Sequence, residues 1–508
     1  INIVMKKNRM EGYNGSASIG FGQGRYSKYN GSLSLSYKKD WFNLFANYSY
    51  ANRKGFNHLM IDRKFYSGDT LVSTFLNDNY MIYPLEIHTP RLGMDFYLSD
   101  KTTVSLLGAG AYRTFEPTSN NTSLIYGLQD QLIGSYDFDN TSQDRFYNYE
   151  SNVQLRHRLD TAGQEIVLNL DYGRYANNDH QDFLSIFTHG LSGPSDTTNL
   201  ISKQIGNLHL YSVKLDYTKP LSSSLTFEAG AKSSLVDSDK NMQFYNRVNE
   251  QDIFDTARSS HFLYSENINA GYVNFTKKYD KLSLQAGLRA EQTIAKGKQL
   301  LNGQDFDRNY LQVFPTAYLS YMVNSNHSFN VNVGRRINRP NYEQMNPFRR
   351  LIDANTYSEG NPYLLPQITY LAEVGYSYSS KFFASFGYNY ATDNILSVLI
   401  QDPVTKNTVQ TVVNLEEYHY YSLDLSYGAS LAKWWRTNTT LSSYFGRYAG
   451  TVKEFTLDQG SPSFHFTSNN SFPIVPGFSA ECNVRYNHKA LYGVTWIRSN
   501  SSVSVGLQ

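Results

Sequence analysis

The sequence has little cysteine, little net charge and no metal-binding signature. Cys482 is the one cysteine among 508 residues, so the chain cannot form an internal disulfide or a thiolate metal cluster. Lysine and arginine number 46 against 44 aspartate and glutamate residues, a formal net charge of +2. A nucleic-acid-binding domain is expected to be far more basic. We therefore expect no nucleic acid among the partners.

Long apolar runs are also missing. No stretch reaches the roughly 18 apolar residues expected of a membrane-spanning helix, and the mean hydropathy is −0.48. This excludes a helical membrane protein but not a β-barrel, in which only the outward half of each strand need be apolar. No linker, composition shift or low-complexity run divides the chain, and a single β-barrel is a standard exception to the usual domain length.

Signatures of catalysis are absent as well. The 11 histidines show no HExxH motif or tight metal-ligand spacing, and no nucleophile elbow or paired-carboxylate spacing stands out. The glycine-rich run at 20–24 is followed by no helix, so the physical basis of phosphate binding is missing. We expect no enzyme activity, no metal site and no cofactor.

Aromatic and small polar residues are abundant and alternate with period two. The chain holds 42 tyrosines and 30 phenylalanines, a composition that favours strands. At 282–291 every second residue is leucine or alanine, and the residues between them are small, polar or charged. Similar alternation occurs at 32–37, 168–172, 211–218, 329–333 and 422–427. A soluble sandwich also alternates, but charges on the second face and aromatic residues near strand ends favour a transmembrane barrel.

The alternation predicts which residues share a face. We expect one set to face lipid, namely Leu215, Leu284, Val331 and Leu423. Their neighbours should face the lumen, namely Asp216, Gln285, Asn332 and Asp424. A slip of one residue would place these charges in hydrocarbon.

The predicted connections alternate between short and long. Short ones lie near 39–40, 99–101, 160–164, 219–220, 279–281, 324–326, 379–381, 432–434 and 473–477. Long ones lie near 53–79, 115–145, 176–206, 235–260, 294–309, 336–366, 392–416 and 449–460. Outer-membrane barrels have short periplasmic turns and longer extracellular loops. We therefore place the long connections on the extracellular rim, and Asp100, Asp280 and Ser380 on the opposite rim.

The fold class is thus all-β, a large antiparallel transmembrane β-barrel. About 20 strands are present against the 22 typical of plugged transporters. Because the sequence ends within an alternating segment at 503–507, we expect a final hairpin to be missing.

Residues 334–366 form a long connection between two alternating segments, 328–333 and 368–378. Four prolines in it remove backbone donors, so we expect it to lie outside the sheet interior. Loops of this length are functional or disordered, and the aromatic content argues against disorder. The candidate ligand-binding residues are Arg335, Arg336, Arg339, Tyr342, Phe348, Arg349, Arg350 and Tyr363.

These arginines allow two interpretations. Guanidinium groups with aromatic neighbours could grip an anionic or oxygen-rich ligand at the lumen mouth. Alternatively, the arginines pair with Glu343, Asp353 and Glu359 or brace the connection on the wall.

The same connection carries a family resemblance. Arg-Ile-Asn-Arg-Pro at 336–340, Asn-Pro-Phe at 346–348 and Gly-Asn-Pro-Tyr-Leu-Leu-Pro at 360–366 resemble the barrel signature of TonB-dependent outer-membrane receptors. The branch it resembles most is the outer-membrane β-barrel family typical of Bacteroidetes. Residues 1–8 (INIVMKKN) look like the end of the plug domain that precedes such barrels. The resemblance implies residues 1–11 as the end of the plug and start of the barrel, and residues 12–508 as the barrel.

The resemblance implies a function. Such a receptor lies in the bacterial outer membrane and takes up a scarce nutrient such as a siderophore, peptide, glycan or cofactor. Its partners are outer-membrane lipid, its own plug domain, the TonB energy-coupling complex and, in some cases, a surface lipoprotein or larger complex. Charged residues predicted to face the lumen could dock the plug or simply be solvated: Asp171, Lys214, Asp216, Arg289, Glu291, Glu373 and Asp424. The alternative is a structural, adhesive or complex-forming outer-membrane barrel without active transport.

Overall fold

The computed structural model describes residues 11–301, 303–353, 355–402, 404–452 and 455–507. The predicted end of the plug, residues 1–11, therefore lies almost entirely outside the described residues. No helix within the described ranges is long and apolar enough to cross a membrane.

The described chain is almost entirely β-structure, with one short helix. Its elements are β1 (Gly12–Gln23), β2 (Ser27–Lys39), β3 (Phe42–Ser67), β4 (Thr70–Tyr97), β5 (Thr102–Phe115), β6 (Thr118–Tyr126), β7 (Leu132–Arg158), β8 (Glu165–His189), β9 (Ser195–Pro220), β10 (Leu225–Val248), β11 (Gln251–Phe254), β12 (Ser260–Lys278), β13 (Leu282–Gln299), β14 (Asp305–Met322), β15 (His327–Asn338), α1 (Tyr342–Met345), β16 (Arg349–Asp353), β17 (Thr356–Glu359), β18 (Gln367–Tyr378), β19 (Phe382–Gln401), β20 (Thr408–Ala432), β21 (Trp435–Val452), β22 (Phe455–Val475), β23 (Phe478–Asn487), β24 (Ala490–Tyr492), β25 (Thr495–Ile497) and β26 (Asn500–Leu507).

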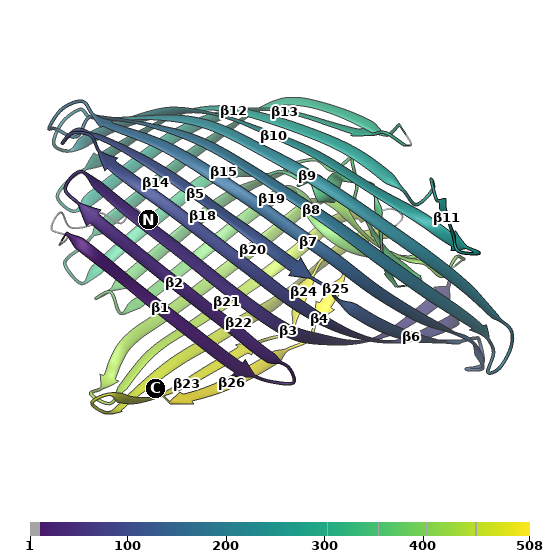
Figure 1. Cartoon of the computed structure of the whole chain (residues 1–508). Helices are drawn as coiled ribbons and strands as arrows, with labels where there is room; N and C mark the ends of the chain where they lie inside the picture. The colour runs from purple at the N-terminus through teal and green to yellow at the C-terminus, as the bar shows by residue number, and fades with distance from the viewer. Residues whose placement is uncertain (1–10, 302, 354, 403, 453–454, 508) are drawn as a thin grey trace.

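One 24-stranded sheet curls into a barrel (Figure 1). Within the described residues, twenty of its strands form an antiparallel meander in which each long strand pairs with the next along the chain. The remaining four, β6, β11, β16 and β17, are short additions at one end, and β24 and β25 form a separate hairpin. This is the large antiparallel barrel that the alternation predicts.

The register aligns apolar residues across neighbouring strands. Leu284 pairs with Leu319, which pairs with Val331. The row continues through Val374 and Phe386 to Leu423. Because paired residues of an antiparallel sheet point to the same face, six successive strands present one continuous apolar row, as the sequence predicts.

The β15–β18 connection identifies the inner face of the barrel. It leaves the wall between β15 and β18, yet its side chains reach β10, β13 and β20. A segment can contact such widely separated strands only from the interior. Met242 on β10 contacts the connection and is therefore inward, and by register so are Gly230 on the same strand and its partner Asp216. Leu215 then faces outward, and the residue is 47% exposed.

Figure 1 separates the connections into two rims, a short-turn rim on the left and a long-hairpin rim on the right. The predicted alternation, with short connections on one rim and long ones on the other, is therefore correct. The prediction that the long connections are loops is wrong for most of them, because the strands simply continue. β3 and β4 run for 26 and 28 residues and are joined at Gly68 and Asp69 alone. The alternating sequence continues past the membrane-spanning length, so backbone pairing continues with it.

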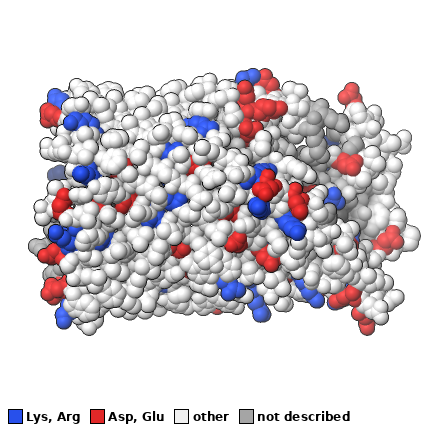
Figure 2. Space-filling model, turned by 90° about the horizontal axis from the view of Figure 1, so that it is seen from above, with Lys and Arg blue, Asp and Glu red and all other residues white. Residues whose placement is uncertain are grey.

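Aromatic residues ring the outer face near both rims. Near the short-turn rim Trp434, Trp435 and Phe472 stack on one another. Toward the long-hairpin rim tyrosines pair with histidines, as where the Tyr48 hydroxyl lies 2.7 Å from His88 Nδ1. Figure 2 shows charged side chains at the left end and over the right half of one face, with a mostly uncharged band between them. This is the layout of a barrel whose middle contacts lipid.

The register predicts opposite effects of the same substitution on adjacent residues. Leu284→Arg places a charge in the apolar row and should lower the free energy of unfolding in lipid by about 2–4 kcal/mol. Gln285→Arg points into the lumen and should change it far less. Equal losses for the two variants in urea titrations of the lipid-embedded barrel would contradict the assigned register.

Candidate functional site

The β15–β18 connection is folded rather than irregular. It contains α1 and the β16–β17 hairpin, and it rejoins the wall where β18 pairs with β15. The expectation that it lies outside the sheet is wrong for its central part, because β17 pairs in parallel with β20. The hairpin lies between Pro347 and Pro362, so the prolines bound the sheet segment without interrupting it.

A capping box and a glycine close the connection on itself. The Asn341 side chain accepts from the Gln344 backbone, and the Gln344 side chain accepts from the Asn341 backbone, which satisfies donors at the start of α1. Gly360 donates to the Asn346 carbonyl at 3.1 Å, and a Cβ there would meet three carbonyl oxygens of 343–346 within 3.0 Å. Only glycine allows this approach.

Three polar anchors fix the connection to the wall. Arg339 forms an ion pair with Glu291 on β13 at 2.5 Å and also donates to Thr293. Arg308 on β14 donates to the backbone carbonyls of Pro362 and Leu364. Asn414 on β20 exchanges two hydrogen bonds with the Leu365 backbone, at 2.7 and 2.9 Å. Both ends of the connection are therefore tied to neighbouring strands.

Apolar contacts hold its middle. Phe348 packs into a buried cluster with Phe138, Phe183, Leu200, Met242 and Phe244. Its ring stacks on Phe244 with centroids 6.0 Å apart. Met345 enters a second cluster with Phe262, Tyr264 and Ala295. These side chains come from strands on the far side of the connection, so the connection leans across the interior.

The hairpin and the ends of two barrel strands form a small inner sheet, in the order β16, β17, β20, β19. One face packs Leu396, Val398 and Leu415 against Tyr448, with the β24–β25 hairpin nearby through Val494. The other face carries Arg350, Ser358 and Gln410, which line a cavity.

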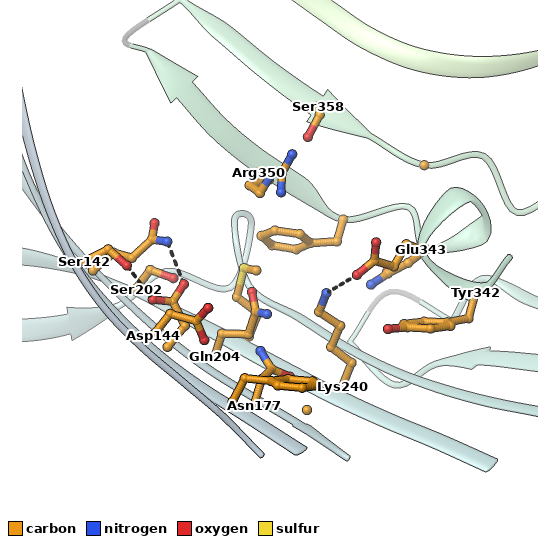
Figure 3. Close-up of a pocket in the computed structure, with 18 of the residues that line it drawn as sticks. Ser142, Asp144, Asn177, Ser202, Gln204, Lys240, Tyr342, Glu343, Arg350 and Ser358 are labelled. Carbon is orange, nitrogen blue, oxygen red and sulfur yellow. Dashed lines mark hydrogen bonds and ion pairs between the residues drawn. The ribbon is translucent and has the colours of Figure 1, made fainter. Parts of the chain in front are cut away.

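The cavity has a volume of about 670 Å³ and lies between the barrel wall and the connection (Figure 3). Its floor is the inner face of β5 and β7–β10, where paired residues form two rows. One row is Phe115, Asp144, Asp179, Gln204 and Met242. The next is Arg113, Phe146, Asn177, Gly206 and Lys240. Its roof is formed by α1, Phe348 and the inner sheet.

Two ion pairs lie in the cavity. Arg113 contacts Asp144 at 2.5 Å, and Lys240 on the floor reaches Glu343 on the roof at 3.7 Å. Figure 3 shows this second pair joining the two sides of the cavity. Burial beside Glu343 raises the pKa of Tyr342 to about 12, so its hydroxyl keeps its proton at neutral pH. Within the described part of the chain, no group of three or more histidine, cysteine, aspartate or glutamate side chains is arranged to hold a metal ion.

A model of the outer membrane protein beta-barrel family matches residues 157–508. The chain belongs to this family. The barrel is therefore an outer-membrane protein, and the long-hairpin rim corresponds to the extracellular side of such barrels.

Solved structures of receptors and a transporter share this fold. The copper transporter OprC has a TM-score of 0.67 at 10% identity, with 99% of this chain and 75% of that chain covered. The siderophore receptor PiuA from Acinetobacter baumannii has a TM-score of 0.60 at 10% identity, with 98% and 75% covered. The siderophore receptor PirA from Pseudomonas aeruginosa has a TM-score of 0.56 at 11% identity, with 99% and 75% covered. At these identities the likeness shows the fold alone. No curated protein sequence matches the chain.

The candidate ligand-binding residues of this outer-membrane barrel divide into two groups. Tyr342, Phe348 and Arg350 line the cavity. The other five lie elsewhere: Arg339 is held by Glu291, Arg349 by Glu359 at 3.1 Å, and Arg335 by the Val313 carbonyl and Gln312, while Arg336 and Tyr363 are exposed. Arg339 and Arg349 thus have the wall-bracing and internal pairing that the alternative interpretation describes.

The seven charged residues predicted to face the lumen all lie on the inner face by register. Lys214 and Asp216 form an ion pair at 2.7 Å, and Tyr272 donates to Asp216. Arg289 shares Glu291 with Arg339. Asp171 accepts from Asn152 at 2.6 Å. Glu373 and Asp424 continue the inner face across β18 and β20.

Sequence reasoning missed the cavity floor. Asp144, Asp179, Lys240, Asn177 and Gln204 all lie in segments predicted as long loops. The available signal was the alternation itself, which continues through these segments and places every second side chain on one face.

The anchors predict unequal roles for two arginines of the connection. Arg339→Ala removes a pair whose side chains are only 18% and 11% exposed, and it should weaken local stability by about 1–3 kcal/mol. Arg349→Ala breaks a pair that is 57% and 29% exposed and should cost less than about 1 kcal/mol. Native-state proteolysis of the connection measures the loss of local stability in each variant. Normal heat-modifiable migration on gels shows first that each barrel has assembled. Equal protection of the two variants would show that Arg339 is no anchor.

Proposed function

We propose that this chain is the barrel of a TonB-dependent outer-membrane transporter, and that its cavity captures a scarce nutrient. The observation that carries the proposal is the inward-folded connection, which encloses the cavity against the barrel wall. A volume of about 670 Å³ falls in the range of small-molecule sites, roughly 300–1,000 Å³. The long-hairpin rim faces the medium in such barrels, so the cavity is placed to receive a ligand from outside.

Dependence on TonB rests on the resemblance of 336–348 and 360–366 to receptors of that class. In this reading a plug domain fills the lumen, and the inner-face charges supply its contacts. Lys214, Asp216 and Arg289 support this role, because all three project inward, from β9 and from β13, with β10 and β12 between those strands in the sheet. A wide barrel interior needs such a plug to stay closed between transport events.

Transport requires the connection to move, because it lies across the interior. Its fixed points are the three polar anchors, two apolar clusters, the Lys240–Glu343 pair and the short β17–β20 pairing. Barrel strands, by contrast, are paired along most of their length. The connection is therefore the element whose displacement opens a path at the lowest cost in broken contacts.

A reversible cross-link tests this motion in the full-length receptor. Lys240→Cys and Glu343→Cys, made in a Cys482→Ser background, can be bridged by a short methanethiosulfonate reagent because their side chains meet across the cavity. The nutrient is first identified by growth of a deletion strain on a panel of oligosaccharides, peptides and ferric chelates. Cross-linking should then lower uptake by more than about tenfold, and reductant should restore it.

The matched control bridges Lys296→Cys to Asp307→Cys, an ion pair at 3.3 Å on the outer face. This bridge should leave uptake unchanged. Full uptake with the connection cross-linked would exclude the proposed path. A deletion strain that grows normally on every nutrient but loses attachment to surfaces would favour the structural or adhesive alternative.

A further inference from the structure

The cavity surface is dominated by uncharged hydrogen-bonding groups. Among the described residues that line it, nine are asparagine or glutamine, four are acidic and three are cationic. Arg113 is paired with Asp144, and Lys240 with Glu343. The amides therefore outnumber all the charged groups together, and two of the three cations are already neutralised.

Two of the amides face the space without a protein partner. No side-chain hydrogen bond joins Asn177 or Gln204 to another described residue, and Figure 3 shows them side by side on the floor. Gly206 follows Asn177 in the same row, and the Asn177 carboxamide lies where a Cβ of Gly206 would be. Glycine at 206 thus gives this amide its place on the floor.

Serine hydroxyls extend this surface. Ser142 and Ser202 lie on the floor beside the two amides, and Ser358 faces them from the roof (Figure 3). Hydroxyls and carboxamides both donate and accept hydrogen bonds. On a paired sheet, neighbouring side chains of one face are spaced by about 4.8 Å across strands. The floor therefore offers a regular array of groups that each donate and accept hydrogen bonds.

We propose that this cavity binds an uncharged oligosaccharide, and the proposal rests on the transport function proposed above. Sugar hydroxyls match the array because adjacent hydroxyls on one ring also donate and accept together. Phe146 and Tyr175 on the barrel wall and Tyr342 on the roof offer flat apolar surface to the C–H faces of sugar rings.

Two other ligand classes fit the cavity less well. A ferric catecholate is a polyanion and requires unpaired cations, whereas the wall already pairs Arg113 and Lys240 with carboxylates. An extended peptide presents one donor and one acceptor per residue along its backbone, and it needs separate pockets for its side chains. The floor offers a two-dimensional array instead.

Binding to the purified full-length receptor tests the ligand class. The probes are neutral oligosaccharides from disaccharides upward, a ferric catecholate and mixed-sequence short peptides, each titrated by calorimetry. We expect binding of a neutral oligosaccharide and little binding of the other two. Binding of the catecholate or the peptides in preference to every neutral oligosaccharide, or binding of none of the probes, overturns the proposal.

Near-isosteric variants locate the site without removing side-chain volume. Asn177→Asp and Gln204→Glu each replace an amide donor with a carboxylate and should weaken oligosaccharide binding by about tenfold. Gln292→Glu changes an amide on the outer face, where Gln292 donates to Asn309, and should leave affinity unchanged. Unchanged affinity in both floor variants, with heat-modifiable assembly intact, also overturns the proposal.

The two proposals fail separately. If a catecholate binds and the floor variants weaken its binding, the proposal that the cavity captures a nutrient stands. Only the proposal that the nutrient is a saccharide is then overturned. Saccharide binding with uptake that the cross-link between positions 240 and 343 does not slow would leave the ligand class standing and remove the proposed transport path.

Discussion

Backbone hydrogen bonding in lipid is the constraint on which the rest of this molecule depends. Hydrocarbon offers no partner to an open N–H or C=O group, so each strand must pair with its neighbours along the whole membrane-spanning length. Pairing fixes the register, and the register sends every second side chain outward. The row from Leu284 to Leu423 across six strands follows from that pairing. Irregular backbone is then confined to the rims and the interior.

The interior connection meets the same requirement by other means. Its backbone groups are paired within α1 and within the β16–β17 hairpin. Others pair with β20 and with side chains of the wall such as Arg308 and Asn414. Its apolar side chains fill clusters formed by the inner faces of the extended strands. The cavity is the space left between two surfaces whose backbone groups are already paired, and the floor amides Asn177 and Gln204 face into it.

Sequence patterns predicted the wall better than the contents of the barrel. Alternation identifies Leu215 as outward and Asp216 as inward because side-chain direction in a strand depends only on local backbone geometry. The same reasoning identified the 334–366 connection from its prolines, and three of its predicted ligand residues, Tyr342, Phe348 and Arg350, line the cavity. The floor was missed because its segments were predicted as loops, and its contact with the roof was missed because Lys240 and Glu343 lie about a hundred residues apart in sequence. No local pattern reports which strands face each other across a lumen.

The length of the strands has a consequence for how the cell surface is presented. A membrane-spanning strand needs about 9–11 residues, whereas β3, β4 and β7–β10 run for 24 to 28. At about 3.3 Å per residue, more than half of each of these strands extends beyond the bilayer as a continuous paired sheet. The tip at Gly68 and Asp69 is far from the cavity along the chain of paired residues, so its sequence can change without touching the floor. A large particle that approaches this rim therefore meets the tips before it reaches the cavity, and a substitution at a tip leaves the lining of the cavity unchanged.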